Sequence, residues 1–254
     1  MSFFLDCESG ESAIETLCNG FSCSKEALTG VLSSIDIDDI YRKHADEINV
    51  PAEEYLYKHT VDELGPHKLL ASVCWFHLTR TMPSNHFRGG VVPLGQSLDT
   101  VWDMMLSLQR DKTIRDRLSK MRKSGVNNWL FDLKSKDPLH WGPYGILVKD
   151  VAFCARKLGQ HDYLGMPEII EDICNGYKEQ YGGSILETYC DALIPKIVKF
   201  KSDVRLDSGC VEAAVSYVYT YIRKQPTARW SVTCFDGGGV AISSNDILSV
   251  INVK

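Results

Sequence analysis

The spacing of apolar residues changes near residue 65, and this change predicts two kinds of structure. Before that point, apolar residues recur at helical spacing in acidic segments, which predicts short helices at residues 12–19, 24–34, 37–46 and 51–64. Pro51 suits a first helical turn, and Gly65-Pro66 ends the last of these helices. We therefore expect residues 1–65 to form an N-terminal helical cap and residues 66–254 to form an α+β core domain.

The second part opens with a nearly continuous apolar run at residues 69–78, whose aromatic and β-branched side chains predict a buried strand. Further strands are predicted at residues 144–148, 197–200, 230–235, 240–242 and 250–253. Apolar stripes predict helices that begin at Ser97 and Pro167, and others at residues 111–123, 185–193 and 211–222. The order of these elements indicates an α+β fold with an antiparallel or mixed central sheet and packed helices.

Composition narrows the class of protein. The 254 residues are 44% hydrophobic with a formal net charge of -5, which excludes a disordered chain and a globally cationic nucleic-acid binder. The sequence contains no apolar run of about 18 residues, so we expect no membrane association. The N-terminal residues lack the basic region of a signal peptide, and we expect a cytoplasmic protein.

The nine cysteines are odd in number and include no C-x-x-C pair, which favours reduced thiols over a disulfide framework. We expect those with apolar neighbours to be buried as small hydrophobic side chains, namely Cys74, Cys154, Cys174, Cys210 and Cys234. Cys74 and His77 have a C-x-x-H spacing. On a strand these two side chains point to opposite faces, so no metal site is predicted.

The end of the long apolar strand carries the most distinctive chemistry. His77 and Thr79 lie two residues apart, so on a strand they share one face. A neutral imidazole and a hydroxyl can both bond a ribose hydroxyl, and the planar fork of Arg80 suits a diphosphate. The alternative is structural, with His77 satisfied inside the core and Arg80 in a surface ion pair.

These residues resemble the first strand and turn of ADP-ribosyltransferases. The resemblance rests on Phe76-His77-Leu78-Thr79, on Phe87 and Gly90-Val91-Val92-Pro93-Leu94, and on residues 240–250, which are similar to the final strands of that family. The variants most similar are the DNA-targeting toxins and the RNA 2′-phosphotransferases. The resemblance covers about 50 of the residues and implies a nucleotide-binding transferase that uses NAD.

The resemblance also implies roles for individual residues. His77 would hold the nicotinamide-side ribose with support from Thr79, Tyr144 would stack on nicotinamide, and Arg80 would complete the NAD site. The family's catalytic glutamate is replaced here by Gly237-Gly238-Gly239. Asp236, Glu168 and Glu212 are the candidate substitutes, and we assign the catalytic group to His77, Thr79 and Glu212.

The missing glutamate supports a second hypothesis, a non-catalytic binding or inhibitor module with a degenerate site. Such a module would contact a partner protein or nucleic acid. Under either hypothesis, the resemblance to this family implies that the protein acts in conflict between bacteria and phages, in defence or counter-defence. The triple glycine itself favours a tight turn between two strands over a phosphate loop.

Two charged segments lie outside this motif. Glu168, Glu171 and Asp172 share one helix face, as an acid/base pair or as a solvated acidic face. Residues 110–123 hold seven basic and two acidic residues, a local charge of +5. Phosphate contact by Arg115, Lys120 and Arg122 is one interpretation of this segment, and a solvated helix face is the other.

Overall fold

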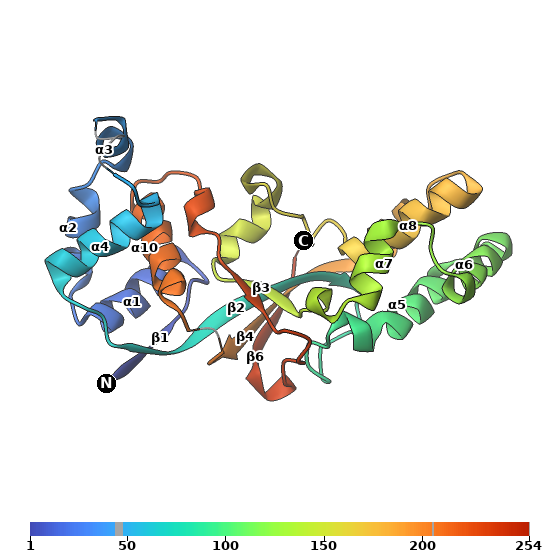
Figure 1. The fold of residues 1–254 in the computed structure, drawn as a ribbon. Coiled ribbons are helices and arrows are strands. Elements are labelled where there is room, and N and C mark those ends of the chain that lie inside the picture. The colour runs from blue at the N-terminus through green and yellow to red at the C-terminus, as the bar shows by residue number, and fades with distance from the viewer. Residues whose placement is uncertain (44–47, 205, 254) are drawn as a thin grey trace. The chain divides into compact units, whose positions relative to one another are not determined.

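Figure 1 shows the fold in a computed structural model that describes residues 1–43, 48–204 and 206–253. The chain divides into two compact units, each built from segments far apart in sequence. The first unit comprises Met1–Phe76, Ile146–Gln160 and Lys201–Phe235, and the second comprises His77–Gly145, His161–Phe200 and Asp236–Lys254. The predicted division between residues 65 and 66 stays a prediction.

The helices of the first unit include those predicted near the N-terminus. They are α1 (Gly10–Phe21), α2 (Lys25–Ser33), α3 (Ile37–Lys43), α4 (Ala52–Leu64) and α10 (Ser208–Ile222). The side chains of Ser9 and Ser24 accept backbone N–H groups at the starts of α1 and α2, which satisfies donors that a helix leaves unpaired. Residues 44–46 of the third predicted helix lie outside the described residues.

Helix α10 is the centre of the first unit, although it follows α1 by nearly two hundred residues. Its side chains from Ala213 to Thr220 are buried around the whole helix, as expected for a helix covered on all sides. It packs against α1, α2 and α4, and Figure 1 shows it in orange among these blue and cyan helices. A Cβ at Gly10 would lie 2.3 Å from the ring of Tyr221, so glycine permits the close approach of α1.

Six strands of the described chain pair in the order β5-β3-β2-β4-β6, with β1 beside β2. They are β1 (Ser2–Leu5), β2 (Leu69–Thr81), β3 (Tyr144–Ile146), β4 (Ile194–Ser202), β5 (Cys234–Asp236) and β6 (Ile247–Asn252). Strands β1 and β2 are parallel, whereas the β2–β3 and β4–β6 pairs are antiparallel. The predicted α+β class is therefore confirmed, and of the two predicted alternatives, an antiparallel or a mixed sheet, the pairing is mixed.

Short strands were the least accurate prediction. Pro195 was expected to precede a strand but lies within β4, where its carbonyl accepts the N–H of Val253 at 2.9 Å. Trp230 lies in a 3-10 turn, Arg229–Ser231, and not in a strand. Residues 240–242 contribute only an isolated bridge between Val91 and Ile242. Short apolar runs carry too few residues for their spacing to distinguish these outcomes.

The helices of the second unit pack around a separate apolar core that includes Trp102, Met105, Leu118, Ile173 and Tyr189. They are α5 (Leu94–Leu108), α6 (Lys112–Ser124), α7 (Trp129–Lys136), α8 (Glu168–Tyr181) and α9 (Leu186–Ala192). Further 3-10 turns in the chain are Pro138–His140, Lys149–Phe153, Ala155–Leu158 and Ser244–Asp246. In the described residues, no helix is both long enough and apolar enough to cross a bilayer.

Two of these helices differ from the sequence analysis: the predicted start of one was wrong, and another was not predicted. Ser97 was expected to cap α5, but the helix begins at Leu94 with Pro93 at its N-cap, and the Ser97 hydroxyl donates to the Leu94 carbonyl. Helix α7 was not predicted. Trp129 and Leu133 of α7 are exposed, so their helical spacing does not mark a face turned toward the core.

Candidate functional site

A pocket of about 460 Å³ lies in the second unit, and every residue that lines it belongs to that unit. Its walls are formed by the end of β2, the loop at residues 85–92, the first three turns of α5, the first turn of α8 and the segments at residues 140–144 and 163–167. Hydroxyl and amide side chains in the lining are Thr79, Thr81, Asn85, Gln96, Ser97 and Thr100; aromatic ones are Phe87, Trp141, Tyr144 and Tyr163. This size and mixture suit a small organic ligand.

His77 lines this pocket, and its hydrogen bond to the backbone determines which ring nitrogen carries the proton. Its Nδ1 lies 2.8 Å from the backbone oxygen of Tyr144. A carbonyl can only accept, so Nδ1 carries the proton and Nε2 of the neutral ring is left as an acceptor. Burial lowers the pKa of His77 below its ordinary value of 6.5, partly opposed by the bond to Tyr144. At neutral pH the pocket therefore contains a neutral imidazole.

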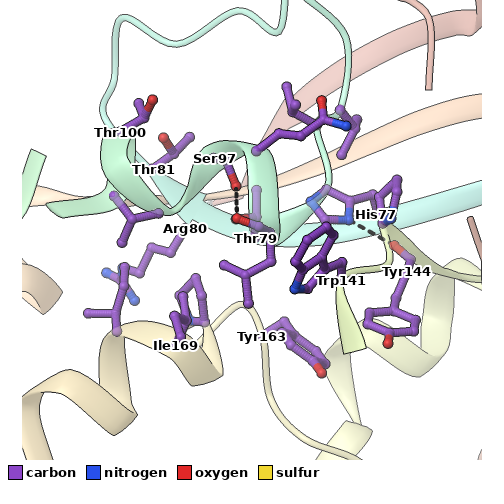
Figure 2. A pocket seen from close by; sticks show the side chains of 18 of the residues that line it. His77, Thr79, Arg80, Thr81, Ser97, Thr100, Trp141, Tyr144, Tyr163 and Ile169 are labelled. Atoms are coloured by element: carbon purple, nitrogen blue, oxygen red, sulfur yellow. Dashed lines mark hydrogen bonds between the residues drawn. The ribbon is translucent and has the colours of Figure 1, made fainter. Parts of the chain in front are cut away.

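Strand periodicity brings Thr79 to the same pocket. The strand β2 continues past His77 to Thr81, so residues 77, 79 and 81 follow one face, and all three line the cavity. Ser97 of α5 lines the same cavity, and its hydroxyl donates to the Leu94 carbonyl (Figure 2). His77, Thr79 and Thr81 therefore form a polar row along one wall of the pocket, in which the first two lie on one strand face as predicted.

Arg80 is held by the protein backbone. Its Nε donates to the Leu193 carbonyl at 2.9 Å, and its Nη atoms donate to the carbonyls of Leu164, Gly165 and Cys190 at 3.2, 3.0 and 2.7 Å. Leu193 and Cys190 lie at the C-terminal end of α9, where carbonyls lack helical partners and attract a cation. The guanidinium fork predicted to face a diphosphate is therefore used to join α9 to the 164–165 loop.

Tyr144 and Trp141 form an aromatic part of the wall. The Tyr144 hydroxyl donates to the Leu139 carbonyl at 3.2 Å, and the ring remains partly exposed. Burial raises the pKa of Tyr144, and the negative charges of Asp236 and Glu168 add to this effect. Trp141 packs on the start of α5, where a Cβ at Gly95 would lie 2.4 Å from its ring.

Among the described residues that line the pocket, Glu168 is the one with a carboxylate side chain. It is the first residue of α8, and its Oε2 lies 3.3 Å from Nζ of Lys134. The same ammonium lies 2.8 Å from Asp172, whose side chain is 6% exposed. Burial raises the pKa of Asp172, and Lys134 partly offsets this increase. The acidic face of α8 is thus partly buried around one lysine and is not simply solvated.

The other proposed carboxylates lie elsewhere. Glu212 belongs to α10 in the first unit, where its charge adds to the effect of burial in raising the pKa of Tyr57. Neither Glu212 nor Asp236 is among the described residues that line the pocket. His77, Thr79 and Tyr144 are therefore brought together, whereas the predicted catalytic Glu212 is not brought to them within this cavity.

The triple glycine serves as a turn. The N–H of Gly237 donates to the Pro143 carbonyl at 2.9 Å, and the N–H of Gly239 donates to the Gly142 carbonyl at 2.7 Å. These bonds hold the turn beside the segment that precedes Tyr144. Gly238 and Gly239 have positive φ angles, which glycine adopts without steric cost.

The basic segment of α6 is divided between internal partners and solvent. Arg122 contacts Asp99 at 2.8 Å and Asp103 at 2.6 Å, and Arg117 lies over the ring of Tyr181. Arg115 and Lys120 are exposed. The phosphate contact predicted for Arg115, Lys120 and Arg122 stays a prediction, and Arg122 already has two carboxylate partners.

Among the described residues, no three or more His, Cys, Asp or Glu side chains lie in an arrangement that could hold a metal ion. The thiols of Cys74, Cys174 and Cys210 are buried as expected, whereas Cys154 is only partly buried and Cys234 is exposed.

Sequence reasoning missed Lys134, Trp141, Tyr163 and Ser97 as pocket residues. Lys134 comes from the unpredicted helix α7, for which Asn128 was an available signal because its side chain caps the Phe131 N–H. Trp141 and Tyr163 lie on loops, and their spacing carries no periodic signal.

Comparison with known families, curated proteins and solved structures found no match to this chain.

Proposed function

We propose that the pocket of the second unit binds a nucleotide, that NAD is this nucleotide, and that the protein transfers or hydrolyses its ADP-ribose group. The observation that carries the proposal is the neutral His77 imidazole, which lines a ligand-sized cavity with its Nδ1 fixed by Tyr144. Its Nε2 then accepts a hydrogen bond from a ribose hydroxyl. Thr79 supplies a neighbouring hydroxyl that can donate or accept.

The aromatic side chains support the binding of a planar base. Tyr144, Trp141 and Tyr163 line the same cavity as His77, and Figure 2 shows their rings on one side of it. Stacking of nicotinamide on one of these rings would bury apolar surface and leave the ribose near the polar row of β2. Tyr144 is the candidate, because its backbone carbonyl already positions His77.

The diphosphate requires donors other than Arg80, whose bonds to four carbonyls occupy its fork. The first turns of α5 and α8 both line the pocket, and neither has a side chain bonded at its N-cap; at the start of α5 the Leu94 N–H already donates to the Trp141 carbonyl at 2.9 Å, which leaves the N–H groups that follow it. Backbone N–H groups at helix starts bind phosphate oxygens, and the helix dipole favours the negative charge. We place the phosphates there.

Glu168 is the carboxylate that we assign to the reaction in place of Glu212, because it lines the pocket. The ammonium of Lys134 lies 3.3 Å from its Oε2. When the bond between C1′ of the ribose and the nicotinamide nitrogen breaks, nicotinamide leaves with the electron pair. Glu168 would then stabilise the positive ribosyl centre and accept the proton of the incoming hydroxyl group.

Calorimetric titration with NAD tests binding. We expect millimolar NAD to release heat with the unaltered protein and with the control His86→Ala, whose imidazole is exposed and outside the pocket. His77→Ala should weaken the affinity at least about tenfold, the loss expected when a buried hydrogen-bond partner is removed. No heat with the unaltered protein, or equal affinities for the two variants, contradicts the proposal.

The second candidate function is a binding or inhibitor module without catalysis. The turn at Gly237–Gly239 favours it, because backbone bonds to residues 142–143 occupy the position where the family resembled carries its glutamate. The distinguishing result is NAD binding with no release of nicotinamide, together with one stoichiometric protein or nucleic-acid partner in a pull-down. Release of nicotinamide that is lost in Glu168→Gln but kept in Glu171→Gln excludes this candidate.

A further inference from the structure

We propose that Cys18 and Cys23 form a redox-active pair, which a peroxide converts to a disulfide across the end of α1. The pair belongs to the first unit and is not among the residues that line the pocket, and the proposal does not depend on NAD binding. It depends on the way in which α1 ends and α2 begins.

The end of α1 places the two cysteines against each other. Ser22 is in the left-handed conformation, with φ 57° and ψ 36°. The Ser22 N–H donates to the Asn19 carbonyl at 3.4 Å, and the Cys23 N–H donates to the Cys18 carbonyl at 3.0 Å. These two bonds define a Schellman motif, in which the side chains at the positions of Cys18 and Cys23 usually make an apolar contact.

In this protein that apolar contact is a contact between two thiols. Each of the two thiols influences the pKa of the other, which places Cys18 and Cys23 close together. Both residues are partly exposed, so a small oxidant can reach them. The bond from the Cys23 N–H to the Cys18 carbonyl already closes the backbone of this six-residue segment, so a disulfide would cost little further loop entropy.

The surroundings distinguish the two sulfur atoms. Burial raises the pKa of Cys23, but the thiol of Cys18 and the backbone groups of Cys23 and Leu28 oppose this increase. Burial, and then the neighbouring Cys23, raise the pKa of Cys18 to about 12. Cys23 also directly precedes Ser24, the N-cap of α2, and lies near the positive end of that helix. Of the two thiols, Cys23 therefore ionises more readily, so its thiolate fraction attacks the oxidant and Cys18 is the protonated partner.

The reaction balances with a peroxide as the oxidant. The Cys23 thiolate attacks one peroxide oxygen, the O–O bond breaks, and the second oxygen leaves as an alcohol or water after taking a proton. The resulting sulfenic acid is attacked by the sulfur of Cys18, the S–S bond forms, and the S–O bond breaks with release of water. Two thiols are oxidised and one peroxide is reduced, and a dithiol reductant reverses the change.

Peptide mass spectrometry tests the proposal on the full chain. The folded protein is treated with hydrogen peroxide, unfolded, alkylated and cleaved after Glu and Lys. Cleavage after Glu15 and Lys25 isolates a peptide that contains Cys18 and Cys23 but not Cys7. We expect this peptide to carry no alkyl group and to be two hydrogens lighter than the reduced, unalkylated peptide. If a dithiol is added before alkylation, both cysteines should be alkylated.

Variants assign the roles. In Cys18→Ser, Cys23 should accumulate a sulfenic acid that dimedone traps, and in Cys23→Ser, Cys18 should stay fully alkylated. Cys234→Ser, which removes an exposed thiol of the same unit, should leave the Cys18–Cys23 disulfide unchanged. Full alkylation of the 16–25 peptide after peroxide treatment, or linkage of either cysteine to a third thiol, overturns the proposal.

Discussion

The Nδ1 atom of His77 lies 2.8 Å from the backbone oxygen of Tyr144, and this bond determines how the imidazole can meet a ligand. Because a carbonyl only accepts, the bond leaves Nε2 of the neutral ring as an acceptor in the pocket. It also connects the strand β2 to the segment that carries the aromatic wall. A ligand hydroxyl is the complementary group.

The lowered pKa of His77 predicts an effect of pH on stability. Its folded pKa lies below the ordinary 6.5, so as the pH falls below 6.5 the unfolded chain binds a proton that the folded protein does not. Stability should therefore be fully present above pH 6.5 and decrease as the pH falls toward the folded pKa. His77→Gln should lessen this decrease in urea titrations between pH 7 and 5, whereas His86→Gln should not. Equal slopes for both variants contradict the assignment.

Lys134 should matter for stability because it neutralises a buried carboxylate. Lys134→Met would leave Asp172 without the ammonium that lies 2.8 Å away, and we expect the free energy of unfolding to fall by about 3 kcal/mol. The control is Lys136→Met, which removes an exposed partner of Asp132 and should cost less than about 1 kcal/mol. Urea denaturation measures both values, and equal losses would show that Asp172 does not need its partner.

Arg80 should be required for folding stability and not be replaceable by lysine. Both Arg80→Lys and Arg80→Met remove the fork that bonds four carbonyls, and each should lower the free energy of unfolding by about 3 kcal/mol. Arg88→Lys is the matched control, since this side chain is exposed. Chemical denaturation that finds Arg80→Lys as stable as the unaltered protein would contradict the role of the fork.

The contact between Gly95 and Trp141 gives a test of the pocket wall. Gly95→Ala places a methyl group 2.4 Å from the Trp141 ring, and we expect a loss of about 1–3 kcal/mol despite the better helix propensity of alanine. Gly89→Ala, where a Cβ meets no atom within 4 Å, should change stability little. Thermal unfolding and tryptophan fluorescence measure the effect. A Gly95→Ala protein as stable as Gly89→Ala would place Trp141 elsewhere.

Periodicity was sufficient to predict some of the site. The alternation of β2 placed His77 and Thr79 on one face, and the stripe of α8 placed Glu168 at a helix start. Helix α10 was predicted from its apolar residues, although its burial on all sides was not. These features depend on neighbours within a few residues, which is the range that a pattern reports.

The remainder depends on contacts between distant segments. The carbonyls that bind Arg80 come from residues 84 to 113 positions away, so nothing near Arg80 in the sequence indicates them. Trp141 enters the pocket on a loop, and Lys134 enters on a helix whose Trp129 and Leu133 face solvent. Such placements follow from tertiary packing, which local propensity does not encode.

The most direct test of NAD binding at His77 is nitrogen NMR of its imidazole, assigned by comparison with His77→Gln. In the free protein at pH 7.5 we expect a neutral ring with the proton on Nδ1, as the bond to Tyr144 requires. Added NAD should move the Nε2 resonance saturably, with little change at His86. An Nε2 signal that millimolar NAD leaves in place would contradict binding at this pocket.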